Sequence, residues 1–192
     1  MVKYRTAVHE GIMTTSADVL TFWFDELAPK QLFMRDDAVD AQIASRFGQL
    51  HGALVRAVPT NWTTTPRSLL SVVIVLDQFS RNLFRDDARA FAQDTVALAL
   101  TKNAIARGWD TDLSAREKQF LYMPLMHSEV LPDVEHCIVL MQAAGHAAGE
   151  AFAQRHAAVI TRFSRYPGRN AALGRKTTAE EEAFLKTTPH GF

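Results

Sequence analysis

A short motif that occurs twice carries the residues best suited to chemistry in this chain. Phe79-Ser80-Arg81 is followed by Arg85, and Phe163-Ser164-Arg165 is followed by Arg169. Each copy ends a strongly apolar run, so each should close a buried helix. Guanidinium groups are planar and permanently charged, and they bind carboxylates and phosphates through paired hydrogen bonds. The four arginines therefore predict one shared cleft that binds an anion.

The acidic residues around the first copy leave two interpretations open. Asp77, Arg81 and Arg85 are spaced by four residues, which places them on one face of a helix, and Asp94 follows in the sequence. In one interpretation nearby aspartates neutralise the arginines and fasten a loop. In the other, Arg81 and Arg165 keep hydrogen-bond donors free and line the cleft. Three amide side chains would then add neutral hydrogen bonds: Gln78, Asn82 and Asn170.

A second group of polar residues follows Pro124, whose missing N–H frees a backbone acceptor in the preceding turn. His127 and Glu129 lie directly after it. A histidine at a helix end is commonly stabilised by the helix dipole, and that is one interpretation. In the functional interpretation His127 is a general base, with Glu129 or Asp77 as its carboxylate partner.

His156 lies on the apolar face of a predicted helix that leads to Phe163 and Arg165. It is either a hydrogen-bonded core residue or a further residue of the cleft. We predict no metal site, because the sequence has no HExxH motif and no Glu-x-x-His pair, and His136, His146 and His156 do not share a helical face. No G-x-S-x-G nucleophile motif is present either, and we predict no cofactor.

The elements that must position these residues are all helical, because apolar residues keep a spacing of three and four along most of the chain. The third helix should be the central one, since it is apolar on every side. Helices are predicted at about residues 16–27, 36–58, 66–79, 88–107, 132–147 and 150–166, with a fifth helix that opens at Ser114 and a short last one from Thr177 or Thr178. Thr15 or Ser16 should cap the first, Ser114 the fifth, and Pro124 should break or kink that fifth helix. About eight antiparallel helices predict an all-α stack of helix pairs.

Length and composition limit the possible domain organisation, binding partners and cellular location. A chain of 192 residues fits one domain, predicted at residues 15–187, with an N-terminal extension at 1–14 and a C-terminal tail at 188–192. Its 21 acidic and 21 basic residues balance, which argues against binding nucleic acids or anionic membranes through bulk charge. The lone Cys137 and the absence of a long apolar stretch lead us to expect a soluble cytoplasmic protein.

Three segments also resemble the signature blocks of domain-of-unknown-function family 924. They are LDQFSRNLFRDDARAFAQD, YMPLMHSE and HAAVITRFSRYPGRNAALGRKTTAEEEAFL. The resemblance implies a tetratricopeptide-like superhelix of helices, and it implies no activity. The chain departs from the family pattern at Ser80, Ser164 and Gly168, the last of which stands where the family usually has a histidine.

The sequence therefore supports three functions. The first is a binding module whose concave, arginine-lined cleft holds an anionic small molecule or an acidic peptide. The second is a small cofactor-independent enzyme that uses His127 as a general base on an anionic substrate. The third is a protein–protein interaction scaffold, which includes association of two copies as a homodimer.

Overall fold

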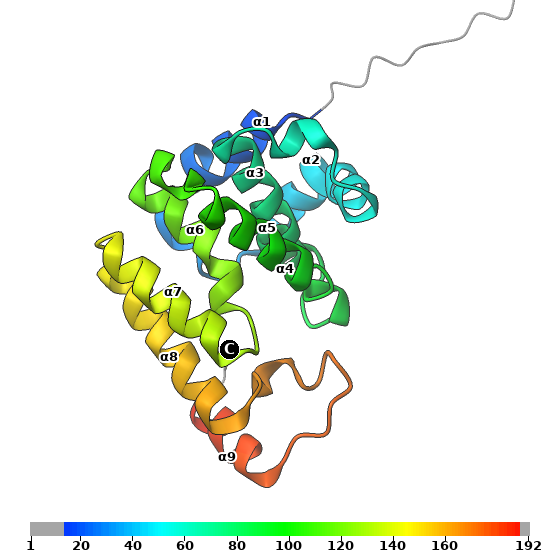
Figure 1. The fold of residues 1–192 in the computed structure, drawn as a ribbon. Helices are drawn as coiled ribbons and strands as arrows, with labels where there is room; N and C mark the ends of the chain where they lie inside the picture. The colour runs from blue at the N-terminus through cyan, green and yellow to red at the C-terminus, as the bar shows by residue number, and fades with distance from the viewer. Residues whose placement is uncertain (1–13, 189–192) are drawn as a thin grey trace, which may run out of the picture.

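The computed structural model describes residues 14–188, and within that range the chain is entirely helical, without any strand, as the sequence predicts. Figure 1 shows α7 and α8 as an antiparallel hairpin, with α9 beside the end of α8. The α-helices are α1 (Ser16–Thr21), α2 (Asp37–Arg56), α3 (Pro66–Val73), α4 (Ser80–Leu83), α5 (Asp94–Ala106), α6 (Ala115–Met126), α7 (Leu131–Ala143), α8 (Ala147–Phe163) and α9 (Ala179–Thr187).

Side-chain caps fix where several helices begin. Thr15, Ser114 and Thr178 each accept a hydrogen bond from the third backbone N–H of the following helix, and a carboxylate at that third position returns the bond. These reciprocal bonds satisfy backbone donors that have no partner within the helix. The predicted cap at Ser114 is confirmed, and of the predicted alternatives the structure selects Thr15 over Ser16 and Thr178 over Thr177.

The central helix is longer than α3 alone, because α3 continues through a π-helical segment, Ile74–Phe79, directly into α4. Every residue from 68 to 80 in this helix is buried, which confirms its predicted central position. A π-helical turn adds a residue to the turn and changes which side chains share a face. Asp77 and Gln78 lie in this segment and are buried with it.

Several predicted helix boundaries are wrong. Residues 88–93 are not part of α5, because the Asp87 side chain accepts from the N–H of Arg89 and holds a 3₁₀ turn at Ala88–Ala90. The helix α7 ends at Ala143, four residues before its predicted end. Pro124 lies inside α6 and does not break it. The helix α8 ends at Phe163, three residues early, because Ser164 adopts a left-handed conformation with a φ of 56°.

The buried apolar residues of the described chain form two separate clusters. The larger one spans the segments from α1 to α8, and its biggest members include Trp23, Phe47 and Phe79. The smaller one lies where α7, α8 and α9 meet and is built around Tyr166 and Ile160. Two polar residues connect to these clusters. Asp77 belongs to the central helix of the larger cluster, and Arg169 closely follows Tyr166 of the smaller one.

The predicted domain limits stay a prediction. Thr14 is described, but the rest of the predicted N-terminal extension at 1–14 lies outside the described residues. Thr188 is described too, and the rest of the predicted tail at 188–192 also lies outside them. Between residues 14 and 188 we find no helix that combines the length and the apolar character needed to cross a membrane.

The capping geometry yields a test of the helical frame. Replacing Ser114 with Ala removes the bond to the Glu117 N–H, and we expect the free energy of unfolding to fall by about 1 kcal/mol in urea denaturation. Ser45→Ala is the matched control, because the exposed Ser45 hydroxyl donates to the Gln42 carbonyl oxygen within α2 and caps nothing. Equal losses in the two variants would contradict the capping role.

Candidate functional site

A cavity of about 470 Å³ lies between the first turn of α5, the end of α6 and the segment that follows α8. Its volume falls in the range of small-molecule sites, about 300–1,000 Å³. Its lining combines apolar walls with charged and polar groups: Ala88, Phe91, Ala92, Asp94, Thr95, Leu98, Pro124, His127, Ser128, Glu129, Val130, Arg169 and Leu173. Three of the predicted site residues, His127, Glu129 and Arg169, are among them.

His127 is held by Asp77, which projects from the π-helical segment of the central helix. The Nδ1 atom of His127 lies 2.8 Å from Oδ1 of Asp77, and the Asp77 side chain is only 1% exposed. Burial raises the pKa of Asp77, but the charge of Arg81 and the hydrogen bonds from His127 and Gln78 outweigh this and hold the pKa well below its usual range. Asp77 is therefore an ionised carboxylate inside the protein.

The state of the His127 ring follows from this contact. Burial lowers the pKa of His127, while Asp77 opposes that shift and Arg81 reinforces it. The neutral ring carries one proton, and an ionised carboxylate can only accept, so Nδ1–H of His127 donates to Asp77. The Nε2 atom is left as a hydrogen-bond acceptor. Of the two partners that the sequence offers for His127, the structure joins it to Asp77.

Asp94 links the two copies of the repeated motif. Its two oxygens each lie 3.0 Å from a terminal nitrogen of Arg81, which makes a bidentate pair. One of these oxygens also accepts from Nη1 of Arg169 at 3.1 Å. Arg81 additionally lies 3.0 Å from Asp77, so a chain of ion pairs runs from the central helix to the segment after α8. Arg81 and Arg169 thus converge on one carboxylate.

Arg169 has an unusual environment for an arginine. Its side chain is 10% exposed, and its Nη2 donates to the backbone oxygen of His127 at 2.9 Å. The guanidinium group also stacks on the rings of Phe91 and Tyr166, 4.8 and 4.5 Å from their centres. Burial lowers the pKa of Arg169, and the nearby charge of Arg81 lowers it further. The charged form of Arg169 is thus less favoured than that of an exposed arginine.

Glu129 lines the same cavity, but its hydrogen bonds go to the segment after α8. Its carboxylate pairs with both terminal nitrogens of Arg175, at 2.7 and 2.9 Å, and accepts from the backbone N–H of Tyr166. Burial raises the pKa of Glu129, but Arg175 and the Tyr166 N–H lower it to below its usual value. Glu129 therefore fixes the segment that carries Arg169, and its described bonds do not include His127.

The structure places Arg165 and Asn170 at α9. Arg165 forms a bidentate pair with Glu181, at 2.6 and 2.8 Å, and also donates to the backbone oxygen of Lys176. Asn170 donates to the same glutamate. Neither Arg165 nor Asn170 lines the cavity, so the two motif copies meet through Arg81 and Arg169 instead of Arg81 and Arg165.

Arg85 and Asn82 lie against α2, where both donate to the carboxylate of Asp40. For these two residues the contacts match the fastening interpretation. Gln78 is buried and donates to Asp77. His156 donates from Nδ1 to the Phe152 carbonyl oxygen, because a carbonyl oxygen can only accept, and its ring centre lies 6.4 Å from that of His127.

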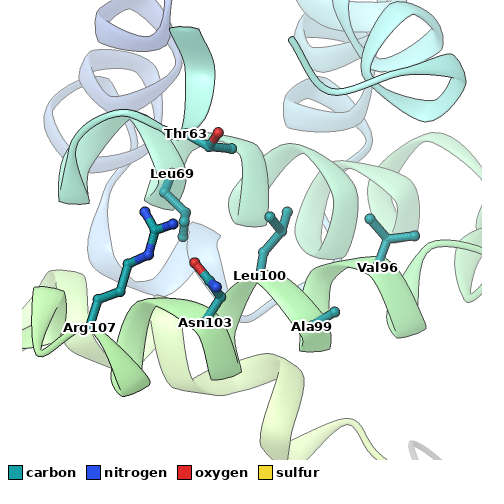
Figure 2. A pocket seen from close by; sticks show the side chains of 7 residues that line it. All are labelled: Thr63, Leu69, Val96, Ala99, Leu100, Asn103 and Arg107. Carbon is teal, nitrogen blue, oxygen red and sulfur yellow. The ribbon is translucent and has the colours of Figure 1, made fainter. Parts of the chain in front are cut away.

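A second cavity of about 380 Å³ lies between α3 and α5, and Figure 2 shows its lining. Leu69 and Leu100 form an apolar floor, and Arg107 and Asn103 stand at one end. Arg107 and Asn103 are exposed, and the ion pairs found among residues 14–188 do not include Arg107. The cavity beside His127 holds buried charged groups and is therefore the stronger candidate.

Several residues of the site were not singled out from the sequence. Phe91 and Tyr166 support the guanidinium groups, and Glu181 and Asp40 bind arginines of the motif. The only local signal was that Phe91 follows the first motif closely and Tyr166 directly follows the second. Asp40 and Glu181 lie in first turns of helices, where acidic residues are common because a negative charge there is stabilised by the helix dipole.

Cys137 is fully buried, and burial raises the pKa of its thiol to about 12, which leaves it an unreactive core residue. Between residues 14 and 188 no three histidine, cysteine or acidic side chains are grouped so that they could hold a metal ion.

Comparison with known proteins places this fold among uncharacterised ones. A family model described as bacterial protein of unknown function (DUF924) matches residues 19–189. A solved structure of a protein of unknown function from Agrobacterium tumefaciens is similar, with a TM-score of 0.84 and 34% sequence identity. The alignment covers 90% of this chain and 97% of that one. The comparison with curated proteins gave no match.

The buried histidines predict how stability depends on pH. Burial lowers the pKa of His51, His127 and His156, and that of His156 to about 3. Each folded-state pKa lies below the unfolded value of about 6.5, so the unfolded chain binds more protons below that pH. Stability should therefore fall from pH 6.5 downward, by about 1.4 kcal/mol per pH unit for His156 alone. Urea denaturation between pH 7 and 5 measures this slope.

The variant His156→Leu should show a slope reduced by about that amount. His136→Gln is the control, because His136 is exposed and its loss should leave the slope unchanged. A slope that is the same in His156→Leu as in the original chain would contradict the assignment of a neutral, buried His156.

Proposed function

The chain belongs to the DUF924 family of bacterial proteins of unknown function, and for this member we propose a binding function: the cavity beside Arg169 holds a small molecule through an anionic group. The observation that carries the proposal is the shared use of one carboxylate by two buried guanidinium groups. Arg169 contacts Asp94, whose two oxygens are already paired with Arg81.

The electrostatics of Arg169 favour an added negative charge. A buried cation without a counter-ion of its own is destabilised by lost hydration, and charges act more strongly where water is excluded. The lowered pKa of Arg169 reflects both effects. A carboxylate or phosphate in the cavity would supply the missing counter-ion, and the fork of the guanidinium group suits the geometry of either anion.

The rest of the lining supports a small organic ligand over a bare ion. Phe91, Leu98 and Leu173 supply apolar wall, and Ser128 and His127 supply polar contacts. Cavities of this kind, mostly apolar with a few convergent polar groups, are typical of small-molecule sites. Under this proposal Arg81 is a positioning residue, since its bonds to Asp77 and Asp94 hold the wall in place.

A second candidate function is a small enzyme that uses His127 as a general base. The contact that favours it is the 2.8 Å pairing of His127 with the ionised Asp77, which fixes the tautomer and leaves Nε2 basic. Turnover of a ligand found for the cavity, lost in His127→Leu with binding retained, would support this candidate over binding alone.

The binding proposal predicts that stabilisation by a ligand depends on Arg169 and not on Arg165. In a thermal-shift screen of carboxylates and phosphates, a ligand at a hundred times its dissociation constant should stabilise the protein by about 2.7 kcal/mol. Arg169→Gln should abolish this gain, because it removes the charge that faces the cavity. Arg165→Gln should retain it, because Arg165 is paired with Glu181 and does not line the cavity.

Equal loss of the ligand effect in Arg165→Gln and Arg169→Gln would count against the site. A screen in which none of the anions stabilises the protein, while Arg169→Gln only lowers the melting temperature, would mean that Arg169 is a structural fastener.

A further inference from the structure

We infer that the ligand of this cavity is a zwitterionic amino acid with an apolar side chain, whose carboxylate binds Arg169 and whose ammonium group donates to Nε2 of His127. The inference rests on the proposed binding function and adds the chemical class of the ligand. Three features carry it: an acceptor beside the buried cation, the charge balance around the cavity, and the apolar rim.

The first feature is the His127 acceptor. Since Nδ1–H donates to Asp77, a ligand can bind the ring only through Nε2, which accepts and cannot donate. Among residues 14–188, the described ring bond of His127 uses Nδ1 and not Nε2. The His127 side chain is 12% exposed and lines the cavity.

The residue that carries the acceptor is in direct contact with the cation through its backbone. Arg169 donates to the backbone oxygen of His127 itself, at 2.9 Å, so the guanidinium group lies next to the residue that carries the ring. A ligand with a negative group and a donor on adjacent atoms fits this arrangement. An α-amino acid has this pattern, because its carboxylate and ammonium groups are attached to one carbon.

The second feature is the charge balance. The ionised groups around the cavity are three carboxylates and three guanidinium groups: Asp77, Asp94, Glu129, Arg81, Arg169 and Arg175. With His127 neutral, their charges cancel. A purely anionic ligand would pair with Arg169 but leave a net negative charge in a partly dehydrated site, so it should bind less tightly than a ligand that also carries a cation. A zwitterion adds a counter-ion at Arg169 and a cation beside acceptors, and it preserves the balance.

The third feature is the apolar rim. Val130 and Leu173 line the cavity although their side chains are 56% and 38% exposed, and Phe91 lies deeper, under the two guanidinium groups. Exposed apolar residues that border a cavity gain from being covered. An aliphatic or aromatic side chain on the ligand would cover them.

Three compounds that share a 3-methylbutyl group test the inference by titration calorimetry. L-leucine has both charged groups, 4-methylpentanoate lacks the ammonium group, and 3-methylbutylamine lacks the carboxylate. We expect leucine to bind at least tenfold tighter than either of the other two. A parallel set of phenylalanine, 3-phenylpropanoate and 2-phenylethylamine covers a larger side chain.

Two variants assign the two contacts. His127→Leu should remove the advantage of leucine over 4-methylpentanoate, and Arg169→Gln should remove its advantage over 3-methylbutylamine. His136→Leu, on the exposed face of α7, is the matched control and should bind as the original chain does. Ala92→Trp covers the case in which the buried variants do not fold: Ala92 lines the cavity from an exposed position, and the added ring should block leucine binding.

The outcomes separate the two proposals. If 4-methylpentanoate binds as tightly as leucine and Arg169→Gln weakens both, the amino-acid inference is overturned and the binding function stands. If none of the amino acids, carboxylates and phosphates binds, both are overturned. Leucine binding that is unchanged in Ala92→Trp also overturns the inference, because the ligand would then lie elsewhere.

Discussion

The buried carboxylate of Asp77 is the interaction on which the other parts of the site depend. An ionised group at 1% exposure is tolerated only when charges and hydrogen bonds replace its lost water, and Arg81, His127 and Gln78 do so. Two of these residues also link the central helix to another element, His127 at the end of α6 and Arg81 through its pairing with Asp94 of α5. Through them the central helix determines the tautomer of His127 at the end of α6 and the direction of Arg81 toward α5.

The network of ion pairs also explains how two separate apolar clusters form one structure. The larger cluster surrounds the central helix, and the smaller one surrounds Tyr166. Between them, Asp94 joins Arg81 to Arg169, and Glu129 joins Arg175 to the backbone of Tyr166. Polar contacts of this kind depend strongly on geometry, so they fix the relative position of the two clusters more narrowly than apolar contact alone.

The arginines of the repeated motif divide into two groups, according to whether each shares its carboxylate partner with another arginine. Arg85 and Arg165 each face a carboxylate of their own in a bidentate pair, and their role is to connect helices. Arg169 shares its carboxylate with Arg81 and lies over aromatic rings in a cavity. The first group is satisfied within the chain, whereas Arg169 would gain from a further anion. The proposed function follows from this difference in local charge balance.

The sequence alone determined the helical class, the buried central helix, the capped start at Ser114 and the neighbouring residues from which the caps Thr15 and Thr178 come, because these depend on residues within a turn or two of each other. It also singled out His127, Arg81 and Arg169. Only the tertiary structure decided their partners: Asp94 lies 75 residues from Arg169, and Asp77 lies 50 residues from His127. Local spacing suggested Glu129 for His127 and Arg165 for the cleft, yet packing brought Arg175 to Glu129 and Glu181 to Arg165. Periodicity fixes the face of a helix on which a side chain lies, but the opposing charge on that face depends on which helices pack together.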